Sequence, residues 1–157
     1  MLDFDNDFDV IIIHRDAESA AGSSRVTEIQ DGVTDAGVSW PVIPVVPIRM
    51  TEAWLLLDEQ EIREVAGRPS GSQPLGLPAQ AGIERLVDPK AALGAALDRA
   101  SGFSGRRLAK FKRDFSEHRR QLLDRLDRNG PIKGLAAWSR LEKDVEQAMS
   151  LLLSHPE

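Results

Sequence analysis

The sequence contains no cysteine among its 157 residues. This absence excludes a disulfide framework and thiolate metal sites, and it fits a protein of the reducing cytosol. Long hydrophobic runs are also missing, because every apolar stretch is far shorter than the roughly 20 residues that span a bilayer. The residues before the first apolar run are too acidic and too weakly apolar for a secretory signal. We therefore expect a soluble cytoplasmic protein with no membrane partner.

Several common enzyme signatures are absent as well. There is no Walker loop, dinucleotide glycine motif, nucleophile elbow or zinc motif. The formal charge of -5 provides no general attraction for nucleic acid, so such binding requires a local basic patch. With 41% hydrophobic residues, the chain can bury one substantial core. We expect a single domain, in which a core over 1–67 and a loop over 68–78 precede a helical region over 79–157.

Two apolar runs predict a small parallel sheet. The β-branched run at 10–13 shows no alternation, which is typical of a strand covered on both faces. The second run, at 38–50, contains three prolines, which lack a backbone donor and favour an edge strand or one broken by bulges. Ser23 or Ser24 can begin a helix between them. Together these segments predict a right-handed unit of strand, helix and parallel strand.

Helical patterns occupy the rest of the chain. Thr51 is a candidate N-cap for a helix over 51–67, and Asp88 followed by proline begins another helix. A third pattern repeats apolar residues at helical spacing over 108–126, and a last one covers 135–152. The predicted fold class is therefore α/β, with a small parallel sheet flanked by helices and a helical C-terminal part.

Acidic and imidazole side chains follow the first strand. Open α/β sheets bind ligands at the carboxyl ends of their strands, where His14, Asp16 and Glu18 stand in the sequence. Asp16 and Glu18 are candidate ligands for Mg²⁺ or Mn²⁺, which prefer carboxylate oxygens, and the alternative is a solvated loop in which Asp16 caps a turn. His14 is a candidate catalytic acid or base, with a hydrogen-bonded structural residue as the alternative.

The second strand ends close to Arg49 and Glu52, on the edge expected for Asp16. Glu52 is a second candidate catalytic residue, and the alternative is a carboxylate that only stabilises the helix dipole. Arg49 is a candidate phosphate contact or a counter-charge for Glu52, and Arg15 is another candidate phosphate contact. We expect Asp16 and Glu18 to share one cation, with Glu52 facing the same cleft.

One segment of this acidic protein is locally basic. Residues 105–120 concentrate seven Lys and Arg side chains opposite an apolar stripe. Such a surface can contact the phosphates of a nucleic acid or a nucleotide. The alternative is a solvated helix face paired with Asp114 and Glu117. The candidate phosphate-binding residues are Arg106, Arg107, Lys110 and Arg113.

Several sequence blocks together resemble one family. The blocks are HRDAE after the first strand, PVVPIRMTEAWLLLD around the second, DPK at a helix start and the Gly-Arg-Arg segment at 105–107. They resemble the DUF4276 family of bacterial Toprim-like proteins. The resemblance implies a Toprim-like fold that uses Mg²⁺ for phosphodiester chemistry, with Asp16 and Glu18 at the positions of an Asp-x-Asp metal pair. Glu52 matches the glutamate of the family's Glu-Ala-Trp block.

The family normally begins with a strand and an acidic motif that this sequence does not contain. We expect either a start upstream of Met1 or a degenerate member without that strand. Three functions are consistent with these observations. One is a Mg²⁺-dependent phosphoesterase or nuclease, and another is a non-catalytic nucleic-acid-binding or accessory module with a partner protein from a bacterial defence operon. The third is an enzyme that binds a small-molecule phosphate, and the oligomeric state stays open.

Overall fold

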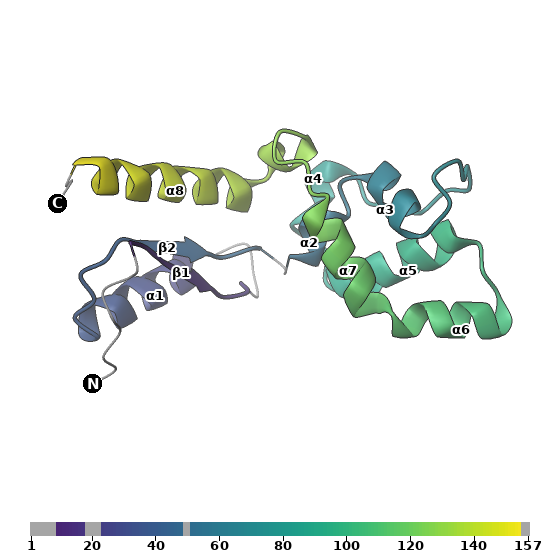
Figure 1. The fold of residues 1–157 in the computed structure, drawn as a ribbon, viewed down its shortest axis with the longest axis horizontal. Helices are drawn as coiled ribbons and strands as arrows, with labels where there is room; N and C mark the ends of the chain where they lie inside the picture. The colour runs from purple at the N-terminus through teal and green to yellow at the C-terminus, as the bar shows by residue number, and fades with distance from the viewer. Residues whose placement is uncertain (1–8, 18–22, 49–50, 155–157) are drawn as a thin grey trace.

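The computed structural model describes residues 9–17, 23–48 and 51–154. Figure 1 shows two parts side by side, a sheet that lies between two helices and a group of helices next to it. The sheet part contains β1 (Ile11–His14), α1 (Ser23–Asp35), β2 (Val42–Val45) and α8 (Ala136–Ser154). The helical part contains α2 (Glu52–Leu55), α3 (Glu59–Val65), α4 (Gln80–Ile83), α5 (Pro89–Ser101), α6 (Gly105–Arg113), α7 (Phe115–Asp124) and the 3-10 helix η1 (Pro131–Gly134). The described residues form a mostly helical α/β fold, and this coarse prediction is confirmed.

β1 and β2 form a parallel pair, in a register that begins with Ile11 opposite Val42. The prolines that flank β2 contribute acceptors to this pair. The Pro41 carbonyl accepts from the Ile11 N–H at 2.9 Å, and the Pro47 carbonyl accepts from the Ala17 N–H at 3.1 Å. Because the described sheet has two strands, β2 lies at an edge, where proline is tolerated. The predicted order of strand, helix and parallel strand is confirmed.

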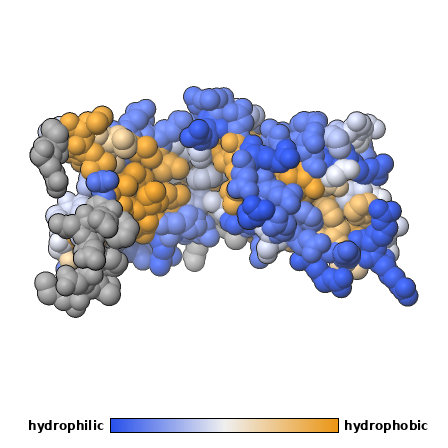
Figure 2. All heavy atoms as spheres, in the orientation of Figure 1, coloured by the Kyte–Doolittle hydropathy of each residue, from blue (hydrophilic) through white to orange (hydrophobic). Residues whose placement is uncertain are grey.

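β1 is covered on one face only. Its side chains alternate in burial, and Ile12 is 63% exposed. α1 packs on one face of the sheet, whereas α8 packs against β2 and leaves Ile12 uncovered. The prediction of a strand covered on both faces is wrong, because an apolar run does not reveal which other elements reach it. Figure 2 shows apolar side chains over the end of α8 and the adjoining sheet. Neither α8 nor any other described helix is long and apolar enough to cross a membrane.

Two predicted helices are each divided in two. The helix expected over 51–67 consists of α2 and α3, because the Asp58 carboxylate accepts from the Glu61 N–H at 3.1 Å and caps a new helix. The apolar pattern over 108–126 contains α6 and α7, which meet at Asp114. The apolar stripe continues across both interruptions, so spacing alone predicted unbroken helices.

The start of α5 follows the sequence prediction. Asp88 Oδ1 accepts from the backbone N–H of Ala91 at 2.8 Å, and Pro89 occupies the first turn. Gly102 ends the helix in a left-handed conformation with φ of 61°. With both ends fixed, α5 contacts α2, α3 and α6 and forms the centre of the helical part.

Three apolar clusters hold these elements together. The largest lies in the helical part, where Leu93 and Leu97 of α5 are fully buried. The second joins the two parts, because it contains Ile48 after β2, Trp54 of α2 and Trp138 of α8. The third packs α1 against the sheet. The second cluster therefore fixes the carboxyl end of β2 next to the helical part.

Candidate functional site

The carboxyl end of β1 presents His14 and Asp16 to solvent. The Asp16 side chain is 46% exposed, and its Oδ1 lies 3.7 Å from His14 Nε2. Glu18 lies outside the described residues, so the structure does not test the predicted pair of metal ligands. Between His14 and Asp16 in the chain, Arg15 donates to Glu28 of α1 at 3.0 Å. This contact ties the end of the strand to α1.

Glu52 is buried at the start of α2, and its partner is Arg119 of α7. Arg119 Nε donates to Glu52 Oε1 at 2.8 Å, and Arg119 Nη2 donates to the Thr51 hydroxyl at 2.5 Å. The Glu52 side chain is only 6% exposed, and its Oε2 has no hydrogen-bond partner among the described residues. Arg49, which the sequence suggests as a counter-charge for Glu52, lies outside the described residues. The Glu52–Arg119 pair ties α2 to α7 at the carboxyl end of β2.

The described residues do not complete a site for Mg²⁺ or Mn²⁺. No group of three His, Asp or Glu side chains that could hold a metal occurs within 9–17, 23–48 and 51–154. Asp16 has an imidazole as its neighbour and Glu52 contacts a guanidinium, whereas these ions prefer several oxygen ligands. Metal binding stays a prediction that depends on Glu18.

The basic surface divides into paired and unpaired cations. On α7, Arg120 contacts Glu117 at 2.6 Å and Asp124 at 2.8 Å, and the hydrogen bonds from Arg120 help to lower the pKa of Glu117 to about 2. Glu117 is therefore engaged within its own helix and does not neutralise α6. Four exposed cations of α6 form no ion pair with another described residue, and these are Arg106, Arg107, Lys110 and Arg113.

A row of rings connects this basic surface with α7. The Arg107 guanidinium lies 4.4 Å from the centroid of the Phe103 ring, in a cation–π contact. Phe103 meets Phe111 edge to face at 5.7 Å, and Phe111 stacks on His118 at 4.1 Å. Arg107 therefore lies at one end of a row of three rings that leads from α6 to α7.

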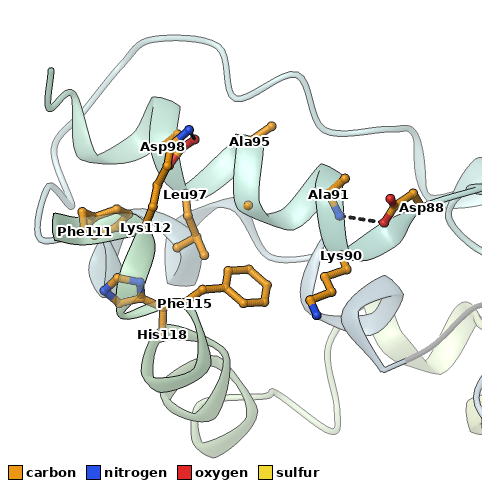
Figure 3. A pocket seen from close by; sticks show the side chains of 11 residues that line it. Asp88, Lys90, Ala91, Ala95, Leu97, Asp98, Phe111, Lys112, Phe115 and His118 are labelled. Atoms are coloured by element: carbon orange, nitrogen blue, oxygen red, sulfur yellow. Dashed lines mark hydrogen bonds and ion pairs between the residues drawn. The ribbon is translucent and has the colours of Figure 1, made fainter. Parts of the chain in front are cut away.

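The row of rings ends at a groove of about 510 Å³ between α5 and the α6–α7 pair, the α5–α7 groove. Figure 3 shows rings from α6 and α7 on one side and α5 on the other. Its apolar wall consists of Ala91, Gly94, Ala95, Leu97, Phe111 and Phe115. Lys112 pairs with Asp98 at 2.8 Å at one end, and Asp88 and Lys90 lie at the other. The DPK block and the Gly-Arg-Arg segment thus stand at the starts of two consecutive helices, α5 and α6, which both border this groove.

His118 presents an uncharged ring to this groove at neutral pH. Burial lowers the pKa of its imidazole below the usual 6.5, and the carboxylates of Asp114 and Glu117 oppose this effect in part. A histidine in this environment therefore serves as an aromatic surface instead of a cation at pH 7.

We expect an NMR pH titration of the His118 ring to give a pKa below 6.5. Glu117→Gln should lower it further, because that change removes a negative charge that favours the imidazolium form. Asp124→Asn is a suitable control, since Asp124 contacts Arg120 and is not among the groups that shift the pKa of His118. An upward shift in Glu117→Gln would contradict this account of the ring's environment.

Comparison with models of known families, with curated proteins and with solved structures finds no match to this chain. The DUF4276 resemblance stays a prediction.

Proposed function

We propose that this protein binds the phosphate backbone of nucleic acid, with α6 as the contact helix. The observation that carries the proposal is the group of unpaired cations on α6, in a chain whose formal charge is -5. A cation without a carboxylate partner keeps its full attraction for phosphate, and its binding releases counterions from the nucleic acid. Arg107 adds a further guanidinium to the same helix.

Charge pairing elsewhere in the helical part supports a specific role for α6. Three other arginines of this part contact carboxylates, in the pairs Arg63–Glu59, Arg119–Glu52 and Arg125–Glu61. On α6, in contrast, Arg106 and Lys110 are four residues apart, and like charges at this spacing destabilise a helix by roughly 0.2–0.5 kcal/mol. A bound phosphate backbone would remove this repulsion.

A Toprim-like fold is part of the same proposal. It is supported by the parallel pairing of β1 with β2 and by Asp16 at the carboxyl end of β1. Phosphodiester hydrolysis at Asp16 and Glu18 stays a prediction, because Glu18 lies outside the described residues. Contact with a partner protein of a bacterial defence operon also stays a prediction.

Charge reversal on α6 tests the proposal. We expect the triple variant Arg106→Glu, Lys110→Glu, Arg113→Glu to bind nucleic acid about tenfold more weakly at physiological ionic strength, because phosphate contacts are lost. The salt dependence should also become shallower, by roughly 0.7–0.9 in the log–log slope for each lost contact. Fluorescence anisotropy with labelled DNA or RNA over a series of salt concentrations measures both effects.

A variant of equal net charge provides the matched control. Arg85, Lys133 and Lys143 are exposed and lie outside α6, so reversing these three charges changes the total charge by the same amount. The control should lose much less affinity than the α6 variant. Equal losses would show that net charge, not α6, governs binding, and no binding by the parent would refute the proposed function.

A further inference from the structure

The α5–α7 groove is kept open by a glycine that packing does not require. Gly94 lies in the interior of α5, where a glycine makes the helix less stable than an alanine would. A Cβ added at this position would meet only the Phe115 ring, at 3.8 Å, which is an ordinary contact. Neither a left-handed backbone nor a close neighbour explains the glycine, and its missing side chain enlarges the groove.

The polar groups of the groove suit a neutral ligand with both donors and acceptors. Lys112 and Asp98 pair with each other, and Asp88 and Lys90 add one charge of each sign at the other end. The charges of these four side chains cancel, so the groove carries no net positive charge that would attract a phosphate. A volume of about 510 Å³ lies within the range of roughly 300–1,000 Å³ that is usual for small-ligand sites.

The groove lies next to the α6 cations, to which a row of aromatic rings connects it. Phe111 and His118 line the groove and continue the row of rings that begins under Arg107 on α6. A strand whose phosphates follow the α6 cations would therefore have its bases next to aromatic surfaces. Bases stack on such surfaces with little dependence on sequence, provided that they are unpaired.

We propose that the protein prefers single-stranded nucleic acid and that one unpaired base occupies the α5–α7 groove. The inference rests on the proposed function of α6, which supplies the phosphate contacts. The Lys and Asp side chains at the groove ends face the polar edges of the base, and Phe111, Phe115 and His118 contact its apolar surface. A base within a duplex is stacked on both faces and paired with its complement, so it does not enter the groove.

Three probes of equal length test this inference by fluorescence anisotropy. They are a labelled single strand of thymidines, a strand of abasic residues with the same phosphates, and a blunt duplex. We expect the parent to bind the thymidine strand about fivefold to a hundredfold more tightly than the abasic strand, which is the range for stacking of one base. The duplex should bind no more tightly than the abasic strand.

Variants that fill the groove should lose the preference for the thymidine strand over the abasic strand but keep the binding of phosphates by α6. Gly94→Leu places a side chain in the groove, and Ala91→Leu does so from the exposed first turn of α5 with less risk to folding. Both should bind the thymidine strand only as tightly as the abasic strand. Gly32→Leu is the matched control, because Gly32 also lies in a helix with open space around it, in α1.

The outcomes separate this inference from the proposed function. If thymidine and abasic strands bind the parent equally well, and the α6 charge reversal weakens both, then α6 binds phosphates and the groove proposal is wrong. Preference for the duplex, or an unchanged preference for the thymidine strand in Ala91→Leu, would also overturn it. If the parent binds none of the probes, both proposals fail.

Discussion

Replacement of Arg119 by methionine is expected to destabilise the protein by about 2–3 kcal/mol. The variant keeps an apolar stem of similar length but leaves the Glu52 carboxylate buried without its partner. Removal of one member of a fully buried pair costs roughly 3–5 kcal/mol, and we expect less here because the Arg119 side chain is about one third exposed. Urea denaturation followed by circular dichroism measures the change.

The double variant Arg119→Met, Glu52→Gln tests the physical reason for this loss. It removes the buried charge together with its partner, so it should be more stable than Arg119→Met alone. A double variant that is as unstable as the single one would show that lost packing, not the unpaired carboxylate, dominates. Arg125→Met is a useful comparison, because the Arg125–Glu61 pair is exposed and should contribute roughly 0–1 kcal/mol.

Replacement of Trp138 by alanine should have the largest effect on stability, a loss of about 3–5 kcal/mol. Trp138 is buried in the cluster that joins the two parts of the fold, and its ring meets Trp54 edge to face at 5.3 Å. Without the indole, α8 loses contacts with residues of both the sheet part and the helical part. We expect the backbone amides of β2 and α8 to lose protection from hydrogen exchange before those of α5.

A change at the exposed end of the same helix serves as the control. Leu153 is 77% exposed, so Leu153→Ala should change the free energy of unfolding by no more than about 0.5 kcal/mol. Equal loss of protection throughout the Trp138→Ala variant would show that the two parts unfold as one unit. Such a result would contradict the separate role assigned here to the joining cluster.

The sequence predicted those features that depend on local patterns. Asp88 followed by Pro89 identified the start of α5, and the two apolar runs identified the parallel strands. The division at Asp58 was missed because a cap within a continuous apolar stripe resembles an ordinary polar residue on the exposed side of a helix. Such a break becomes evident only when the backbone partner of the carboxylate is known.

The candidate site was less predictable, because it depends on contacts between distant residues. Glu52 and Arg119 are 67 positions apart, and no spacing rule links them. Phe111 and Phe115 belong to the apolar pattern over 108–126, which gives no indication that a groove with Gly94 lies beside them. The unpaired cations of α6 were present in the predicted basic surface, but only the fold shows which of the neighbouring arginines are already paired.

The packing of α8 on β2 has a consequence for the order in which the protein folds. β1, α1 and β2 leave the ribosome before α8, yet α8 covers one face of β2. The helical part between them has its own apolar cluster, built from contacts that are closer in sequence, and such contacts form faster. We therefore expect the helical part to fold before the sheet part, because β2 obtains its cover only when α8 is present.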